Sequence, residues 1–304
     1  MGKLSVVLPS YNEEAMLPKA ASVLTGLLEQ ERIDFELIFV DDGSKDDTWR
    51  RIEEEARRDG RVHGVHFSRN FGKESAIFAG LASAAGDCVA VMDCDLQHPP
   101  ATLVEMFRLW EQGYEVVEAV KRTRGEEGIF YKLSAGIFYQ IMTLATKIDM
   151  QRASDFKLLD RKAVDALLSL PEKNAFFRAL SSWVGFRQTQ IEFDVQEREA
   201  GESKWSTTAL IRYAISNITG FSTLPMQLVT GAGILVFILA VILGIHTLVQ
   251  YCTGRAVEGF TTVILLILLI GSIIMVSLGI IGYYIARIYQ EVQGRPKYLI
   301  SKKV

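Results

Sequence analysis

The chain has 304 residues, of which 49% are hydrophobic and 23% charged, and its net charge is −3 at pH 7. This length favours two domains, and the composition excludes a disordered or collagen-like chain. Without a sustained basic stripe, nucleic acid is not expected as a partner. Three cysteines are too few for a disulfide framework or a zinc cluster.

The first 121 residues alternate short β-branched runs with helical stretches. Strands are expected at 4–8, 36–40, 62–67, 88–92 and 115–120, and helices at 48–58, 75–85 and 101–110. This alternation predicts βαβ units around a mostly parallel, buried sheet. We therefore expect residues 1–121 to form a nucleotide-binding part of an α/β domain, Rossmann-like in its layering.

Residues 122–209 are less regular and are expected to complete that domain. The pattern predicts a helix at 129–147, followed by the segment 155–159, a short helix from 161 and a strand-like run at 188–195. The start of the chain enters its first strand within four residues and has no apolar secretory segment. The soluble part is therefore expected in the cytosol.

Two apolar runs, 228–249 and 260–286, contain no charged residue, and each is long enough to cross a bilayer. With a short extracytoplasmic loop at 250–259, they predict a transmembrane hairpin. Residues 210–227 mix apolar and polar side chains, which is typical of helices at the membrane interface. Lys and Arg gather on the flanks, so both ends of the chain, including a tail at 287–304, are expected in the cytoplasm.

Three polar clusters follow predicted strands of the sheet. They are Pro9-Ser10-Tyr11-Asn12-Glu13-Glu14, Asp41-Asp42-Gly43-Ser44 and Asp93-Cys94-Asp95-Leu96-Gln97. In an open α/β sheet, ligands bind beyond the carboxyl ends of the strands. The convergence of three such clusters predicts a site at that edge.

The third cluster indicates a metal. Asp93 and Asp95 are spaced to converge on one hard divalent cation, with the amide oxygen of Gln97 as a further ligand. Mg²⁺ or Mn²⁺ held in this way leaves positions open for substrate phosphates. Alone, the Asp-x-Asp pattern is more often a pair of solvated turn carboxylates, and the other two clusters shift the balance toward a site.

A second group of cationic and polar side chains precedes the membrane part: Arg122, Lys132, Arg198, Ser203 and Lys204. Arg and Lys suit a lipid phosphate, and they serve equally well as nonspecific anchors to anionic lipid. The residues alone leave both readings open.

Taken together, these motifs resemble those of family 2 glycosyltransferases with the GT-A fold. The runs Ser-Arg-Asn-Phe-Gly-Lys-Glu, Ser-Asp-Phe-Lys-Leu-Leu-Asp-Arg and Gly-Glu-Ser-Lys-Trp and the two apolar helices narrow the resemblance. They are similar to the polyprenyl-phosphate glycosyltransferases, a group that includes bacterial bactoprenol (undecaprenyl-phosphate) glucosyltransferases and, more distantly, dolichol-phosphate mannose synthase. The implied enzyme moves a hexose, glucose or a related sugar, from a UDP-sugar to polyprenyl phosphate with inversion.

The resemblance also implies roles for single residues. Pro9, Tyr11, Asn12, Glu14, Asp42 and Asp93 would bind the nucleotide sugar, with Tyr11 stacked on the uracil and Asp42 accepting its ring N–H. Asp95 and Gln97, with Asp93, would hold the metal, and Asp155 would act at the acceptor. Residues 122–209 would form the acceptor side, with Arg122, Lys132, Arg198, Ser203 and Lys204 on the lipid phosphate. A homo-oligomer, a tetramer by resemblance, is expected. Ser154 departs from the Gly that is frequent in relatives.

Two other classes of function remain as alternatives. A processive polysaccharide synthase is expected to carry a Gln-x-x-Arg-Trp motif and more membrane helices than two. A non-catalytic membrane module that only binds nucleotide sugar would not need the set Asp93, Asp95 and Gln97. Nucleotide binding that is independent of the metal would favour that module.

Overall fold

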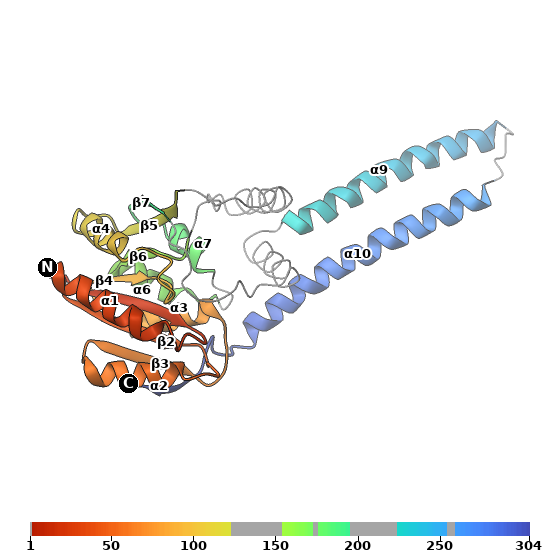
Figure 1. Cartoon of the computed structure of the whole chain (residues 1–304). Helices are drawn as coiled ribbons and strands as arrows, with labels where there is room; N and C mark the ends of the chain where they lie inside the picture. Colours follow the sequence, from red (N-terminus) through yellow and green to blue (C-terminus); the bar gives the residue numbers. More distant parts are fainter. Residues whose placement is uncertain (1, 123–153, 173–175, 195–223, 254–258) are drawn as a thin grey trace. The chain divides into compact units, whose positions relative to one another are not determined.

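The computed structural model describes residues 2–122, 154–172, 176–194, 224–253 and 259–304. The chain forms two compact units (Figure 1). One unit combines residues 1–210 with the C-terminal segment 296–304, and the other comprises residues 211–295. Each unit is described by itself.

The first unit is built on an eight-stranded sheet with the order β7-β5-β6-β4-β1-β2-β3-β8. The bounds of its strands are β1 Leu4–Ser10, β2 Phe35–Asp41, β3 Val62–Phe67, β4 Cys88–Val91, β5 Val116–Lys121, β6 Lys157–Asp160, β7 Gln188–Phe193 and β8 Ile300–Lys303. Strand β1 pairs in parallel with β2 and β4, whereas β6 runs antiparallel to both β4 and β5. The predicted α/β fold class is confirmed, with a mixed sheet in which antiparallel β6 and β8 interrupt the parallel pairing.

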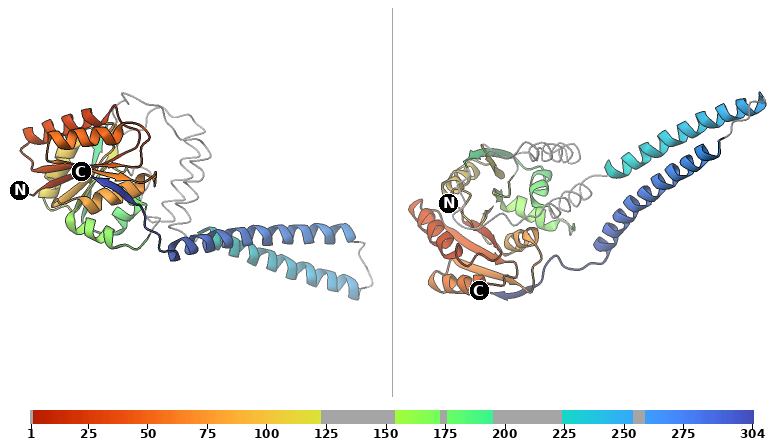
Figure 2. Two further views of the ribbon diagram at one scale, coloured as in Figure 1. Left: turned by 90° about the horizontal axis from the view of Figure 1, so that it is seen from below. Right: turned by 45° about the vertical axis from the view of Figure 1, so that its right-hand side comes forward.

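Among the described residues of this unit, six helices cover the two faces of the sheet (Figure 2). Helices α1 (Leu17–Gln30), α2 (Thr48–Arg58) and α4 (Pro100–Glu111) pack on one face. Helices α3 (Lys73–Ser83), α6 (Arg161–Ser169) and α7 (Phe177–Trp183) form the other layer. Successive side chains of a strand point to opposite faces, so Leu4 and Leu8 face the first layer while Val7 meets Gly80 of α3.

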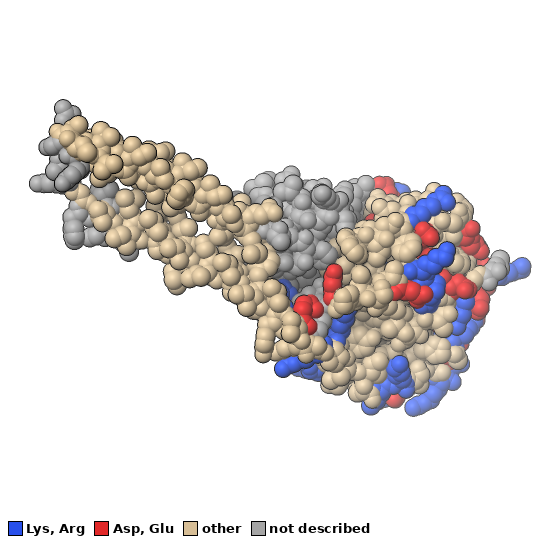
Figure 3. Space-filling model, turned by 180° about the vertical axis from the view of Figure 1, so that it is seen from behind, with Lys and Arg blue, Asp and Glu red and all other residues tan. Residues whose placement is uncertain are grey.

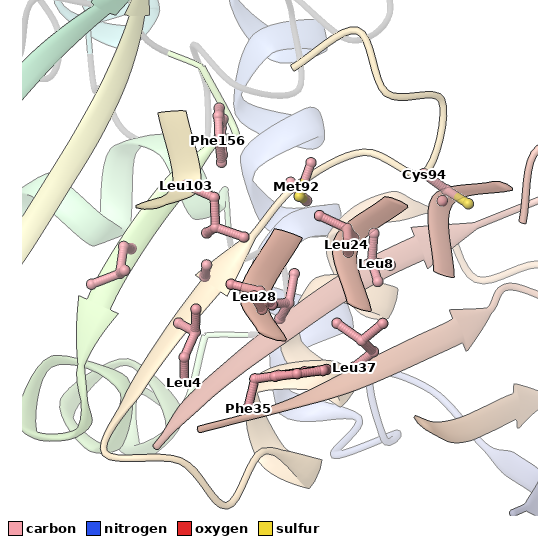
Figure 4. Packing of buried hydrophobic residues seen from close by; sticks show 14 of the residues in the cluster. Leu4, Leu8, Leu24, Leu28, Phe35, Leu37, Met92, Cys94, Leu103 and Phe156 are labelled. Carbon is pink, nitrogen blue, oxygen red and sulfur yellow. The ribbon is translucent and has the colours of Figure 1, made fainter. Parts of the chain in front are cut away.

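A single hydrophobic core lies between the sheet and the first helical layer (Figure 4). Leu24 and Leu28 of α1 lie over Leu8 of β1 and Leu37 of β2, and all four side chains are fully buried. Met92 and Cys94 extend this core into the loop that follows β4. The side chain of Cys94 is buried, so the two aspartates that flank it are attached to a buried residue.

The strand β8 was not predicted, because residues 287–304 were expected as a tail. It pairs antiparallel with β3, with His66 opposite Lys302 and Phe67 opposite Ile300. Just before β8, the ring of Tyr298 stacks on Phe67 at 5.0 Å between centroids. The sheet therefore takes its edge strand from a segment that follows the apolar helices in the chain.

This packing gives a stability prediction. Tyr298→Ala should lower the free energy of unfolding of the first unit by about 2 kcal/mol, because it removes a half-buried aromatic ring from its stack on Phe67. Thermal unfolding of the full chain in detergent measures the change. Leu299→Ala is the matched control, since the Leu299 side chain is 54% exposed. Equal losses in the two variants would contradict the assigned role of Tyr298.

The second unit contains two long helices, α9 (Leu224–Cys252) and α10 (Phe260–Val292). Both carry segments long and apolar enough to cross a membrane, Pro225–Gln250 and Leu269–Val292. Figure 3 shows their surface almost free of Lys, Arg, Asp and Glu in the part described. Helix α9 starts four residues before the predicted span at 228, with Pro225 in its first turn, and α10 extends six residues beyond the predicted end at 286.

Candidate active site

The three polar clusters lie at one edge of the sheet. Strands β2, β1 and β4 are parallel neighbours, so the loops that follow them leave from the same side. Strand β6 is antiparallel to β4, with Lys157 opposite Val91, so Asp155 precedes β6 at that same edge. Helix α3 starts there too, after β3, with Lys73 as its first residue. The topology brings together residues that are far apart in the sequence.

The loops after β1 and β2 are tied to each other by hydrogen bonds. The backbone N–H of Asn12 donates to Ser44 Oγ at 2.9 Å, and Asn12 Oδ1 accepts from the N–H of Lys45 at 3.0 Å. Glu14 Oε2 accepts from the N–H of Asp47 at 2.9 Å. Asn12 holds a left-handed φ of 54°, which Asn tolerates better than most residues. Asn12 and Glu14 thus shape this part of the site.

Asp42 is buried and already holds two backbone donors. Its carboxylate accepts from the N–H of Phe71 at 2.6 Å and of Gly72 at 2.9 Å. Burial raises the pKa of Asp42 despite these two bonds. A carboxylate has about four lone-pair sites, so acceptance of a uracil N–H stays compatible with this geometry. Next to it, Gly43 has a φ of 66°, and a Cβ there would collide with the backbone of Arg69.

Two further residues of the predicted nucleotide site lie at the end of β1 and on the loop after it. Tyr11 is 37% exposed, so its ring is accessible to a ligand. Pro9 is the partner of Val40 in the β1–β2 register and supports the loop from within the sheet. Their roles toward a nucleotide stay predictions.

The Asp-x-Asp loop is fixed by its own side chains. Asp95 Oδ1 accepts from the N–H of Gln97 at 3.1 Å, and Leu96 between them has a left-handed φ of 56°. The N–H of Asp93 donates to Nδ1 of His98, whose buried ring stacks on Phe156 at 4.7 Å between centroids. A positive φ at a bulky residue is strained and is often found at functional sites. The two carboxylates of the loop are therefore held in a strained turn of the kind found at functional sites.

This donor set fits a divalent cation that completes its shell with phosphate oxygens. Among the described residues, no group of three or more His, Cys, Asp or Glu side chains is placed to hold a metal ion. Mg²⁺, however, is commonly bound by one or two carboxylates together with substrate phosphates. Asp93 and Asp95 are both partly exposed and supply that number. The amide of Gln97 as a ligand stays a prediction.

Asp155 is the buried member at the centre of an ion-pair cluster. Its Oδ1 is 2.6 Å from Nε of Arg178, and its Oδ2 is 3.0 Å from Nη2 of Arg178 and 2.9 Å from Nζ of Lys73. Lys73 Nζ also lies 2.5 Å from Oδ1 of Asp93. The cluster Lys73, Asp93, Asp155 and Arg178 thus links the Asp-x-Asp loop to the residue expected at the acceptor.

The opposite charges in this cluster keep one another ionised. Burial alone would raise the pKa of Asp155, but Lys73 and Arg178 outweigh it and hold that pKa far below its usual range. Burial likewise opposes the charge on Lys73, yet Asp155 and Asp93 raise the pKa of its ammonium. Asp155 is therefore an ionised anchor for two cations across the physiological pH range.

Ser154 shows why the local backbone at Asp155 is well defined. Its hydroxyl donates to the carbonyl of Ala119 on β5 at 2.5 Å and accepts from the N–H of Phe156 at 3.2 Å. These bonds fasten the segment before β6 to β5. The Ser that departs from the resemblance thus has a structural use.

Of the predicted acceptor residues, the structure describes Arg122. It lies exposed at the end of β5, with Nη1 3.0 Å from Oδ2 of Asp194. Lys132, Arg198, Ser203 and Lys204 lie outside the described residues. Their roles stay predictions.

Lys73, Glu74 and Arg178 were not assigned roles from the sequence. The signal for Lys73 was present, because it opens a helix directly after β3 at the carboxyl edge. Arg178 had no local signal, since it lies on α7, 23 positions from Asp155 in a separate element. The ion pair between Arg178 and Asp155 is therefore seen only in the structure.

Glu74 gives a prediction about pH. Its carboxylate accepts from the N–H of Phe177 at 2.9 Å, and burial, aided by the charge of Asp155, raises its pKa to about 7. Between the unfolded value near 4.5 and this folded value, the native state binds the extra proton. Stability conferred by that proton is therefore complete below about pH 4.5 and is lost as pH rises through 7.

Glu74→Gln should remove the loss of stability at rising pH, because the amide stays neutral and its oxygen still accepts from the N–H of Phe177. Relative to the wild type, the variant should gain about 1–3 kcal/mol of unfolding free energy between pH 5 and pH 8. Thermal unfolding over this range measures it, with exposed Glu172→Gln as the control. A pH-independent difference would contradict the assignment.

Comparison with known proteins agrees with the fold and the motifs. The profile of "Glycosyl transferase family 2" matches residues 5–168. The uncharacterized glycosyltransferase YkcC of Bacillus subtilis is 40% identical over 300 residues, which cover 98% of this chain and 93% of that protein. The SfII prophage-derived bactoprenol glucosyl transferase of Shigella flexneri is 35% identical over 302 residues, covering 99% of this chain and 98% of that one.

Solved structures support the same architecture. Glucosyl-3-phosphoglycerate synthase of Mycobacterium tuberculosis, in complex with Mn²⁺, UDP and phosphoglyceric acid, superimposes with a TM-score of 0.52. It is 22% identical, and the match covers 72% of this chain and 76% of that one. This likeness establishes the fold. With the family profile and relatives that match nearly end to end, the chain belongs to glycosyl transferase family 2 and is a glycosyltransferase.

Proposed function

We propose that this glycosyltransferase moves a hexose, glucose or a related sugar, from a UDP-sugar to polyprenyl (undecaprenyl) phosphate at the cytoplasmic face of a membrane. One observation carries the proposal: the bactoprenol glucosyl transferase of Shigella flexneri matches 99% of this chain, through both apolar helices as well as the catalytic unit. Helices that span the membrane would hold the catalytic unit where a lipid acceptor lies.

On the donor side, the loops after β1 and β2 would bind the nucleotide. Tyr11 would stack on the base, Asp42 would accept its ring N–H, and Pro9, Asn12 and Glu14 would shape the pocket. Asp95, with Asp93 and Gln97, would hold Mg²⁺ or Mn²⁺, and the synthase of similar fold was solved with Mn²⁺ and UDP. Such a cation supplies charge neutralisation of the leaving diphosphate.

On the acceptor side, the phosphate oxygen needs no strong general base. The second pKa of a phosphate monoester is near 6, so the nucleophile is already anionic at neutral pH. The low pKa of Asp155 is also unsuited to removing a proton. We infer that Asp155 orients the cations around the reacting groups. Arg122, Lys132, Arg198, Ser203 and Lys204 would bind the lipid phosphate.

The sheet supports a hairpin that starts and ends on the same side of the membrane, which we infer to be the cytoplasmic side. Strand β8 follows α10 in the chain, yet it pairs with β3, which precedes α9. Two strands of one sheet lie on the same side of a membrane, so the chain between them must cross an even number of times. A crossing by each of α9 and α10 meets that condition. A homo-oligomer, with a tetramer as its expected form, would give these exposed helices partners.

A phase-partition assay tests the proposal. Full-length protein in detergent would be incubated with undecaprenyl phosphate, Mg²⁺ or Mn²⁺, and radiolabelled UDP-sugars tested one by one. We expect label from one donor to enter the organic phase, and none when the lipid is omitted. Label that stays aqueous with every donor, in folded protein that binds UDP, would overturn the lipid acceptor.

A further inference from the structure

The ammonium of Lys73 occupies a position between two carboxylates. It lies 2.5 Å from Asp93 Oδ1 and 2.9 Å from Asp155 Oδ2. The Lys73 side chain is nevertheless 43% exposed, whereas the side chain of Asp155 is 7% exposed. Lys73 therefore contacts one buried carboxylate, that of Asp155, and one partly exposed carboxylate, that of Asp93.

Asp93, the partly exposed partner of Lys73, belongs to the Asp-x-Asp loop. Lys73 contacts Oδ1 of Asp93, so a divalent cation bound to either oxygen of this carboxylate would lie close to the ammonium, and the two positive charges repel each other. Lys73 in this position therefore weakens the binding of metal to Asp93.

Arg178 makes the displacement of Lys73 feasible. It holds Asp155 through two hydrogen bonds of 2.6 and 3.0 Å, which fix the carboxylate whether or not Lys73 contacts Asp93. Lys73 can thus leave Asp93 and keep a counter-ion on Asp155. Arg178 is a positioning residue here, because it acts through Asp155.

We propose that Lys73 is a resident counter-ion that keeps divalent metal off Asp93 until nucleotide diphosphate is present. This inference rests on the proposed function for the identity of the nucleotide. In the ligand-free site Lys73 neutralises Asp93, so metal alone binds weakly. The diphosphate brings new anionic oxygens, which serve both the metal and the released ammonium. Metal and nucleotide therefore bind cooperatively, and no proton or covalent bond changes in this exchange.

The test compares Mn²⁺ binding with and without UDP in the full-length protein. Lys73→Met should bind Mn²⁺ alone about tenfold more tightly than the wild type, because Asp93 is no longer neutralised. The factor by which UDP tightens Mn²⁺ binding should fall correspondingly, since linkage between two ligands is reciprocal and typically 5–150-fold. Electron paramagnetic resonance of free Mn²⁺ measures both quantities without any turnover.

Two variants complete the design. Lys73→Arg keeps the cation and should behave as the wild type, and exposed Lys162→Met on α6 is the matched control. If Lys73→Met does not fold, Lys73→Gln takes its place. Unchanged or weaker Mn²⁺ binding on loss of the charge would overturn the inference, as would a Lys73→Arg variant that matches Lys73→Met. A wild type that binds Mn²⁺ but not UDP would instead count against the proposed donor, while the nucleotide-free comparison still decides the role of Lys73.

Discussion

Asp155→Asn should lower the turnover number about 10³-fold at every pH from 5.5 to 8.5. The substitution leaves Lys73 and Arg178 facing each other without the carboxylate that both contact. Removing one member of a buried ion pair leaves an uncompensated charge, and the expected loss corresponds to about 4 kcal/mol of the activation barrier at 1.36 kcal/mol per tenfold. Because the pKa of Asp155 lies far below this range, its charge state does not change across it.

The shape of the pH profile distinguishes an anchor from a base. Turnover would be measured at saturating donor and lipid in half-unit steps of pH, alongside thermal unfolding to establish that the variant is folded. A parallel drop at all values fits the anchor. Near-normal turnover at pH 8 with loss at pH 5.5 would instead assign Asp155 a residual proton, and the cluster geometry would then need another explanation.

Asp95→Ala should reduce transfer by about 10³–10⁴-fold and remove the effect of Mn²⁺ on UDP affinity. Metal stabilisation of a leaving group contributes several kcal/mol to a transition state. Under the proposed function Asp95 is a ligand of that metal, and its loss leaves Asp93 as the one carboxylate of the Asp-x-Asp pair. Phase partition measures the first quantity, and UDP titration with and without Mn²⁺ measures the second.

A matched control for this variant is Asp165→Ala on α6. The side chain of Asp165 is 65% exposed and lies on a helix outside the site. It should leave both transfer and metal dependence unchanged. If Asp95→Ala retained a normal response of UDP binding to Mn²⁺, the metal would have to be held elsewhere.

Much of the fold was readable from local patterns. Strand β3 and helix α2 have the predicted bounds, and helix α6 starts at the predicted Arg161. These elements carry strong signals, namely β-branched runs, helical periodicity and turn residues at their ends. Strand β8 carried no such signal, because Ile300–Lys303 is short, exposed and rich in lysine. Its place depends on pairing with β3, which sequence periodicity does not report.

The loops of the site could be predicted from the sequence, whereas its ion pairs could not. Polar side chains after parallel strands indicate a ligand edge by topology alone, which made Asp42, Asp93 and Asp95 visible. The contacts among Lys73, Asp155 and Arg178 join α3, the segment before β6 and α7. Such contacts depend on how layers pack, and one sequence without its relatives carries little information on that.

The origin of β8 has a consequence for how the protein is made. When β3 leaves the ribosome, its partner β8 and both apolar helices have not yet been synthesised. At about 5–20 residues per second, the β3 edge waits roughly ten to fifty seconds, and an unpaired edge is prone to associate with other chains. Completion of the sheet thus comes only after both apolar helices have been synthesised. Until then the β3 edge is exposed to other chains.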